Sequence, residues 1–276
     1  MYANVIKCAP HLQTLISGSL LLTFNGTFEI YSYRVIFLFV FSLYLSKRIK
    51  SKLGGKIIYI PNYQGDASEF EKIIVVSPIY SFGLPVHTYN FLLNVNSNSK
   101  IYVVLNYGGM AGGADVFTYN YAKENNKNIL GVFKMLMPEN YTLTFSTPSI
   151  YNKMILKKSL KKIDDIILKI KQNGVFIPKK AKTNEKIYFT NKSNWHLVAN
   201  DFSVKENCVK CGKCVENCPA NNISFENEEI TFKDNCVACL GCYHRCPQKA
   251  IVYKHRNKKG RYINPFINEN EIGMNF

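Results

Sequence analysis

The sequence predicts an α/β protein with a doubly wound parallel sheet and a small C-terminal α+β domain. Short apolar runs alternate with helical patterns along most of the 276-residue chain, as they do in parallel sheets with helices on both faces. Eight of the nine cysteines then fall within Cys208–Cys246. The expected parts are an atypical N-terminal segment (1–33), the sheet domain (34–175), a linker (176–200), the cysteine-rich domain (201–254) and a basic tail (255–276).

The composition fits a globular protein with a basic surface. Apolar residues make up 47% of the chain, which is enough to fill a core. The formal net charge is +16, which would suit an acidic protein, nucleic acid or an anionic membrane. Ten lysines lie within Lys153–Lys182, and five basic residues lie within Lys254–Arg261. A solvated surface is the simpler explanation of both runs, and a docking site for an acidic partner is the alternative.

The first strand of the sheet is expected at Val35–Phe41, a continuous apolar run. A helix should follow it, because Leu45, Ile49 and Leu53 repeat at helical spacing and Gly54–Gly55 provides a stop.

The same stretch is too short to cross a membrane. Val35–Leu45 has eleven residues, whereas a span needs about 20. Extending the run back to Leu15 would bury Glu29 and Arg34. Leu12–Phe24 lacks the features of a secretory signal. We therefore expect no membrane attachment and no secretion.

Four further apolar runs predict the remaining strands, and they are separated by helical patterns. They read KIIYI from Lys56, KIIVVSP from Lys72, KIYVVLNYGG from Lys100 and NILGVFKM from Asn128. A long helix follows, with apolar residues spaced four, three, four and three from Leu156 to Ile170.

Two loops stand where such sheets bind ligands, beyond the carboxyl ends of the strands. They read SPIYSFGLP from Ser77 and NYGGMAGG from Asn106. Ordinary strand-to-helix turns use the same residue types and remain the alternative. The candidate binding residues are Ser77, Pro78, Ile79, Tyr80, Asn106, Tyr107, Gly108 and Gly109.

The cysteines form an internal repeat of the pattern C-x2-C-x2-C-x3-C-P. The runs are CVKCGKCVENCP from Cys208 and, 28 residues later, CVACLGCYHRCP from Cys236. At this spacing three thiolates can converge on one face of a cubic iron–sulfur cluster. Gly212 and Gly241 should ease the close approach of the backbone. Zinc is the alternative, but it normally takes its four ligands as two pairs.

Residues 201–254 resemble the bacterial two-cluster 4Fe-4S ferredoxins, with all eight ligands and both prolines, Pro219 and Pro247, in place. In that family the fourth cysteine of each run ligates the other cluster. The resemblance therefore implies two sets of ligands. The first is Cys208, Cys211, Cys214 and Cys246, and the second is Cys236, Cys239, Cys242 and Cys218.

A hairpin between the two runs is expected from Ile223–Phe225 and Ile230–Phe232, which flank a polar ENEE turn. Such a small domain has too little core to fold without its clusters. We expect Cys8 to be an incidental thiol and His244 to be a surface residue.

The chain from Ser42 to Ile267 resembles the flavodoxin–ferredoxin fusion proteins of anaerobic metabolism, on PIYSFGLP, NYGG, MPENY and the cysteine runs. The resemblance implies a flavodoxin-like sheet domain that binds flavin mononucleotide (FMN). In that layout Tyr80 and Asn106–Gly109 flank the flavin ring, where an aromatic side chain can stack and glycines admit the backbone.

The phosphate-binding loop of that family is missing. A Ser/Thr-x-Thr-Gly-x-Ser/Thr loop should precede the first helix and hold the flavin phosphate, whereas this chain has FLFVFS and only Ser42 matches. Divergence, another function of the domain, or a reading-frame error upstream of Ser42 would each explain this. We predict that the chain binds FMN weakly or not at all.

These features favour an electron carrier with two 4Fe-4S clusters over a substrate-converting enzyme, and they assign no catalytic residue. The clustered cysteines favour a reducing, cytoplasmic location, and the positive charge favours an acidic redox protein as partner. Two alternatives remain, a flavin-dependent oxidoreductase fed by the clusters and a basic nucleic-acid-binding module with structural clusters.

Overall fold

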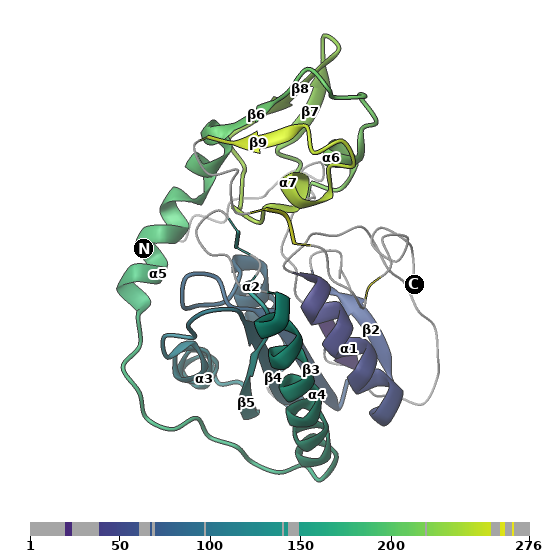
Figure 1. Cartoon of the computed structure of the whole chain (residues 1–276). Coiled ribbons are helices and arrows are strands. Elements are labelled where there is room, and N and C mark those ends of the chain that lie inside the picture. The colour runs from purple at the N-terminus through teal and green to yellow at the C-terminus, as the bar shows by residue number, and fades with distance from the viewer. Residues whose placement is uncertain are drawn as a thin grey trace, which may run out of the picture.

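The computed structural model describes residues 20–23, 39–60, 67, 70–96, 98–139, 141–142, 149–218, 220–254, 260–262 and 267. In Figure 1 a small cysteine-rich domain stands above a larger α/β domain, which we call the sheet domain. Cys8, Val35–Leu38, Pro219 and most of the expected basic tail lie outside the described residues.

The sheet domain is built on five strands in the order β2-β1-β3-β4-β5. The strands β3, β4 and β5 are parallel, as predicted, and β2 runs in the same direction because both it and β3 pair with β1 in antiparallel fashion. The prediction of a wholly parallel sheet is therefore wrong at β1. The bounds are β1 Leu20–Thr23, β2 Lys56–Tyr59, β3 Lys72–Pro78, β4 Lys100–Tyr107 and β5 Ile129–Leu136.

Part of the segment expected to form the first strand belongs instead to the first helix, and another segment occupies that strand's place in the sheet. The helix α1 spans Phe39–Leu53, so the predicted strand is wrong for Phe39–Phe41. Phe41 is only 2% exposed and stands four and eight residues before the buried Leu45 and Ile49. One helical stripe therefore begins at Phe41, and Leu20–Thr23 lies between β2 and β3 instead. The predicted stop is confirmed, since Gly54 follows the last residue with a φ of 77°.

Helices cover both faces of the sheet, as predicted. On one face α1 and α4 (Ser149–Lys171) pack on Ile74, Val76 and equivalent residues of β4 and β5. On the other, α2 (Val86–Asn94) and α3 (Ala114–Glu124) pack on the alternate residues Ile73 and Val75. An ion pair of 2.7 Å between Arg48 and Asp164 also joins α1 to α4.

The segment predicted as a linker is instead folded onto the sheet domain. It contains the helix α5 (Glu185–Asn194) and the 3₁₀ helix η3 (Trp195–Asp201). Tyr188 is 1% exposed and packs edge-on against Tyr89, Phe117 and Trp195, while its hydroxyl donates to the Leu84 carbonyl over 2.7 Å. Most of α5 is exposed. The polar sequence of α5 is therefore typical of a linker, although the buried Tyr188 holds the helix on the sheet domain.

The cysteine-rich domain consists of two small antiparallel sheets and two short helices. The strands β6 and β9 pair with each other, as do β7 and β8. The predicted hairpin is confirmed, with Asn227 and Glu228 both at positive φ in its turn. The bounds are β6 Phe202–Val204, α6 Lys213–Glu216, β7 Ile223–Glu226, β8 Glu229–Phe232, α7 Gly241–Arg245 and β9 Ile251–Tyr253.

Residues 260–262 of the expected basic tail pack on this domain, whereas Ile267 is buried in the core formed with α1 and α4. Arg261 donates to the carbonyls of Lys249 and Ile251 over 2.9 and 2.6 Å, and its guanidinium lies 4.3 Å from the centre of the Tyr243 ring. The Tyr262 N–H donates to Nδ1 of His244 over 3.1 Å. His244 is 3% exposed, so its prediction as a surface residue is wrong.

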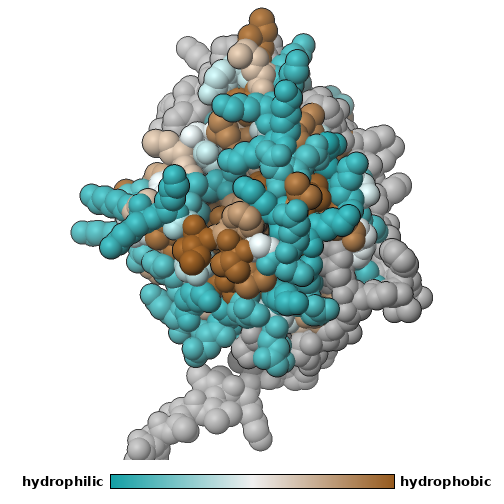
Figure 2. Space-filling model, turned by 90° about the horizontal axis from the view of Figure 1, so that it is seen from below, coloured by the Kyte–Doolittle hydropathy of each residue, from teal (hydrophilic) through white to brown (hydrophobic). Residues whose placement is uncertain are grey.

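The surface is rich in charged side chains. All ten lysines of Lys153–Lys182 are exposed. Figure 2 shows the underside of the sheet domain, where hydrophilic side chains surround a smaller apolar area. Among the described helices there is none with both the length and the apolar character that a membrane span requires.

Candidate metal centres

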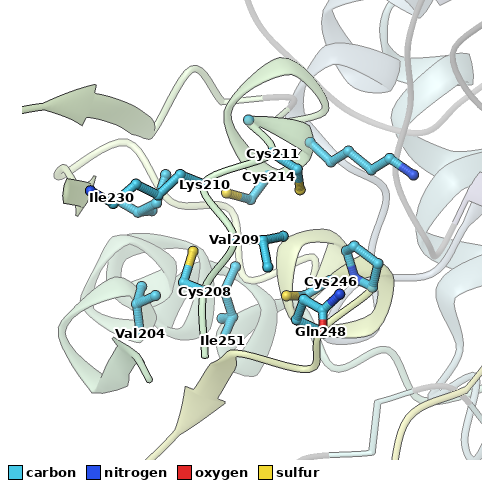
Figure 3. A pocket seen from close by; sticks show the side chains of 13 residues that line it. Val204, Cys208, Val209, Lys210, Cys211, Cys214, Ile230, Cys246, Gln248 and Ile251 are labelled. Atoms are coloured by element: carbon cyan, nitrogen blue, oxygen red, sulfur yellow. The ribbon is translucent and has the colours of Figure 1, made fainter. Parts of the chain in front are cut away.

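The eight cysteines of the C-terminal domain divide into two groups of four, each around its own hollow. The first hollow, about 380 Å³ including its opening to solvent, is lined by Cys208, Cys211, Cys214 and Cys246. Figure 3 shows the sulfur atoms of these four residues gathered around it. The second, about 350 Å³ measured in the same way, is lined by Cys218, Cys236, Cys239 and Cys242. Each group takes three cysteines from one run and the fourth from the other.

The backbone of each run is wound around its hollow by residues in the left-handed conformation. In the first run these are Lys210 and Gly212, with φ of 53° and 71°. In the second they are Ala238 and Leu240, with φ of 54° and 59°. Gly212 is thus matched by Leu240 and not by Gly241, which was expected to play the same part. The conformation repeats although the residue type does not.

Backbone N–H groups point at the sulfur atoms of Cys218, Cys246 and Cys236, among others. Cys218 accepts the N–H of Asn222 over 3.2 Å, and Cys246 accepts that of Ala250 over 3.1 Å. Both donors stand four residues after the last cysteine of their run, a repeat that the sequence analysis did not single out. The N–H of Ala238 lies 3.4 Å from the Cys236 sulfur. Such bonds stabilise thiolates and the clusters they hold.

Burial makes the free thiols weak acids. It raises the pKa of Cys214 and of Cys236 to about 11, and it also raises the pKa of Cys218, Cys239 and Cys242. At neutral pH these residues are therefore thiols until a metal displaces their protons. Metal binding at these sites is consequently coupled to proton release.

The two hollows differ in their surroundings. Cys211, at the first, is exposed, whereas Cys239, at the second, is 8% exposed. Cys239 and Ala220 belong to the same apolar core as α1, α4 and the sheet. The second hollow therefore adjoins the sheet domain, while the first opens toward solvent beside the exposed Lys210 and Lys213.

Comparison with known families agrees with this geometry. Residues 207–251 match the family model of a 4Fe-4S dicluster domain. The cysteine-rich domain is therefore an iron–sulfur domain of the ferredoxin type. No curated protein matches the chain. In the described residues no three Cys, His, Asp or Glu side chains form a site for a single metal ion.

The candidate flavin loops meet at the carboxyl edge of the sheet, as expected. Asn106, at the end of β4, donates from Nδ2 to the Ser42 hydroxyl in the first turns of α1 over 2.7 Å. The Ile79 N–H, after β3, donates to the Asn106 carbonyl over 2.9 Å. Ser77 is buried beside Thr88, 3.5 Å away. The structure thus brings Ser42 together with both loops.

The surroundings of this edge do not fit a flavin phosphate. Phe41, in the first turn of α1, is buried with Met137 and Leu156, and its ring centre lies 5.7 Å from that of Tyr262. The side chain of Glu139 lies against Gly108, where an added Cβ would stand 2.6 Å from a carboxylate oxygen. Apolar side chains at the helix start and a carboxylate at the Gly108 loop are both unfavourable for a dianion.

The aromatic residue expected to stack on the ring is already in contact with protein. Tyr80 is buried, and its ring meets Trp195 of η3 edge-on, with centres 5.6 Å apart. Trp195 is not among the predicted site residues because it lies in the expected linker. The described residues at this edge therefore do not fit FMN.

Proposed function

We propose that this chain is an electron-transfer protein that carries two 4Fe-4S clusters in a crossed arrangement. The proposal rests on one observation, the division of the cysteines into two four-sulfur hollows. The first cluster would be held by Cys208, Cys211, Cys214 and Cys246. The second would be held by Cys236, Cys239, Cys242 and Cys218.

The residues around each hollow supply what such a cluster needs. Bound there, each cluster would take up or release one electron at a time. The cysteines hold it as thiolates, and the N–H groups of Asn222 and Ala250 stabilise the added negative charge. The second hollow adjoins the sheet domain at the buried Cys239, whereas the first has the exposed Cys211. Unequal exposure gives the two sites unequal potentials.

The placement of the hollows supports a direction of transfer. An external protein can reach the first site at Cys211, while the second adjoins the sheet domain. Electrons would therefore pass between a partner and the second site by way of the first. An acidic redox protein suits the exposed Lys210 and Lys213, although Lys210 is also paired with Glu228. A cytoplasmic location suits eight cysteines that must remain reduced.

For the sheet domain we propose a flavodoxin-like fold. Its strand order, 2-1-3-4-5, is the order of that fold, and helices cover both faces. The antiparallel β1 and the apolar start of α1 depart from it. A flavin-dependent oxidoreductase would need the phosphate site that α1 does not offer. A nucleic-acid-binding module rests on the net charge alone and would show a steep salt dependence of binding.

The proposal is tested by a reductive titration under exclusion of oxygen. Two clusters accept about two electrons per chain in total, and the unequal surroundings should separate the two midpoints. Visible bleaching and paramagnetic resonance follow each step. Uptake of about one electron per chain, or a colourless protein that carries zinc, would overturn the assignment.

A further inference from the structure

Asn222 touches both chain segments that form the second hollow. It is 2% exposed and lines that hollow. Its backbone N–H donates to the Cys218 sulfur over 3.2 Å, and its carbonyl accepts the Lys233 N–H over 2.7 Å. Its side-chain Oδ1 accepts the N–H of Asn235, the residue directly before Cys236. One buried residue therefore joins the end of the first cysteine run to the start of the second.

The repeat provides an internal comparison. Ala250 is the equivalent of Asn222, and its backbone makes the same two contacts, to the Cys246 sulfur over 3.1 Å and from the Lys205 N–H over 2.9 Å. Alanine has no side chain that could make the third contact. At the first hollow a different residue makes the corresponding link, since Asn207 donates from Nδ2 to the Gln248 carbonyl over 2.8 Å at an exposed position.

We propose that the Asn222 side chain is a positioning residue for the second cluster, an inference that rests on the proposed function. The ligands of that cluster come from two segments, with Cys218 on one and the other three cysteines on the other. The bond from Asn222 to Asn235 fixes the separation of these segments, and its acceptor side chain is buried although Asn235 itself is exposed. Asn207 does the same for the first cluster, but at an exposed position where water competes for the bond.

Removal of the link should loosen one cluster and not the other. Loss of a residue that orients metal ligands typically lowers metal affinity by about 10- to 100-fold. Asn222→Ala should therefore release iron from the second site at least about ten-fold faster under a chelator. Asn207→Ala should change release from the first site by only about two- to three-fold, because its bond is exposed.

The two sites can be followed separately by cysteine labelling. Intact protein, loaded with clusters, is mixed with an iron chelator and an alkylating agent without oxygen, and labelled peptides are counted over time by mass spectrometry. The fully stripped protein shows that all eight cysteines can react. In Asn222→Ala we expect Cys218, Cys236, Cys239 and Cys242 to be labelled early, with the other four at the wild-type rate.

Two companion variants separate positioning from packing. Asn222→Gln keeps an uncharged acceptor oxygen and should release iron closer to the wild-type rate, whereas Asn222→Leu keeps the size without the acceptor and should behave like Asn222→Ala. Equal rates in the Gln and Leu variants, equal acceleration at both sites, or unchanged release in Asn222→Ala would each overturn the inference. A wild-type protein that binds no clusters would instead refute the proposed function.

Discussion

Replacing Cys218 by alanine tests the crossed arrangement, because this cysteine belongs to the first run in sequence and to the second hollow in space. The substitution leaves the second site with three thiolates and removes the sulfur that accepts the Asn222 N–H. The first hollow keeps all four of its cysteines. Of about eight iron atoms in two 4Fe-4S clusters, the four at the second site should become labile, and about four should resist a chelator.

The assay is the same cysteine labelling, read together with iron content. In Cys218→Ala the residues labelled early should be Cys236, Cys239 and Cys242. The matched control is Cys246→Ala, which should expose Cys208, Cys211 and Cys214 instead. The reasoning is refuted if Cys218→Ala exposes its own sequence neighbours, because ligation would then follow the runs and not the hollows.

Three further predictions concern the C-terminal Arg261, the helix α5 and the basic helix α4. Arg261→Ala should destabilise the cysteine-rich domain by about 1–3 kcal/mol, since it loses two charge-assisted bonds and a ring contact; an unchanged melting temperature of the loaded protein would argue against this. Tyr188→Phe should cost about 1–3 kcal/mol in denaturant unfolding because the buried Leu84 carbonyl loses its donor, and a loss below about 0.3 kcal/mol would contradict it. If Lys157 and Lys161 steer an acidic redox partner, electron transfer should slow with rising salt; a rate independent of salt would make them ordinary solvated residues.

The sequence predicted best what depends on neighbours along the chain. The spacing of each cysteine run fixes three sulfurs around one hollow, and the short ENEE turn fixes the hairpin of β7 and β8. The strands β2 to β5 were also found at the expected apolar runs, and β3, β4 and β5 are mostly buried between the helices. Local pattern and final structure agree in these places.

The failures concern features that are decided at long range. In the sequence, Phe41 is equally compatible with a strand and with a helix. Its packing with Met137 and Leu156 shows that it begins the buried stripe of α1. The direction of β1 cannot be read from three leucines and a threonine. The segment taken for a linker is held by Tyr188, and the segment taken for a tail is held by Arg261. In both cases a few side chains that pack on the domains, Trp195 and Tyr262 among them, outweigh a polar surrounding sequence.

The central claim is tested most directly by the iron, acid-labile sulfide and flavin content of the chain purified without oxygen. Two 4Fe-4S clusters predict about eight iron and about eight sulfide per chain. The apolar start of α1 and the position of Glu139 predict that flavin, added in excess and then removed by gel filtration, stays far below one per chain. About four iron, or zinc without sulfide, would contradict the two-cluster account, and one tightly held flavin per chain would contradict our reading of the sheet edge.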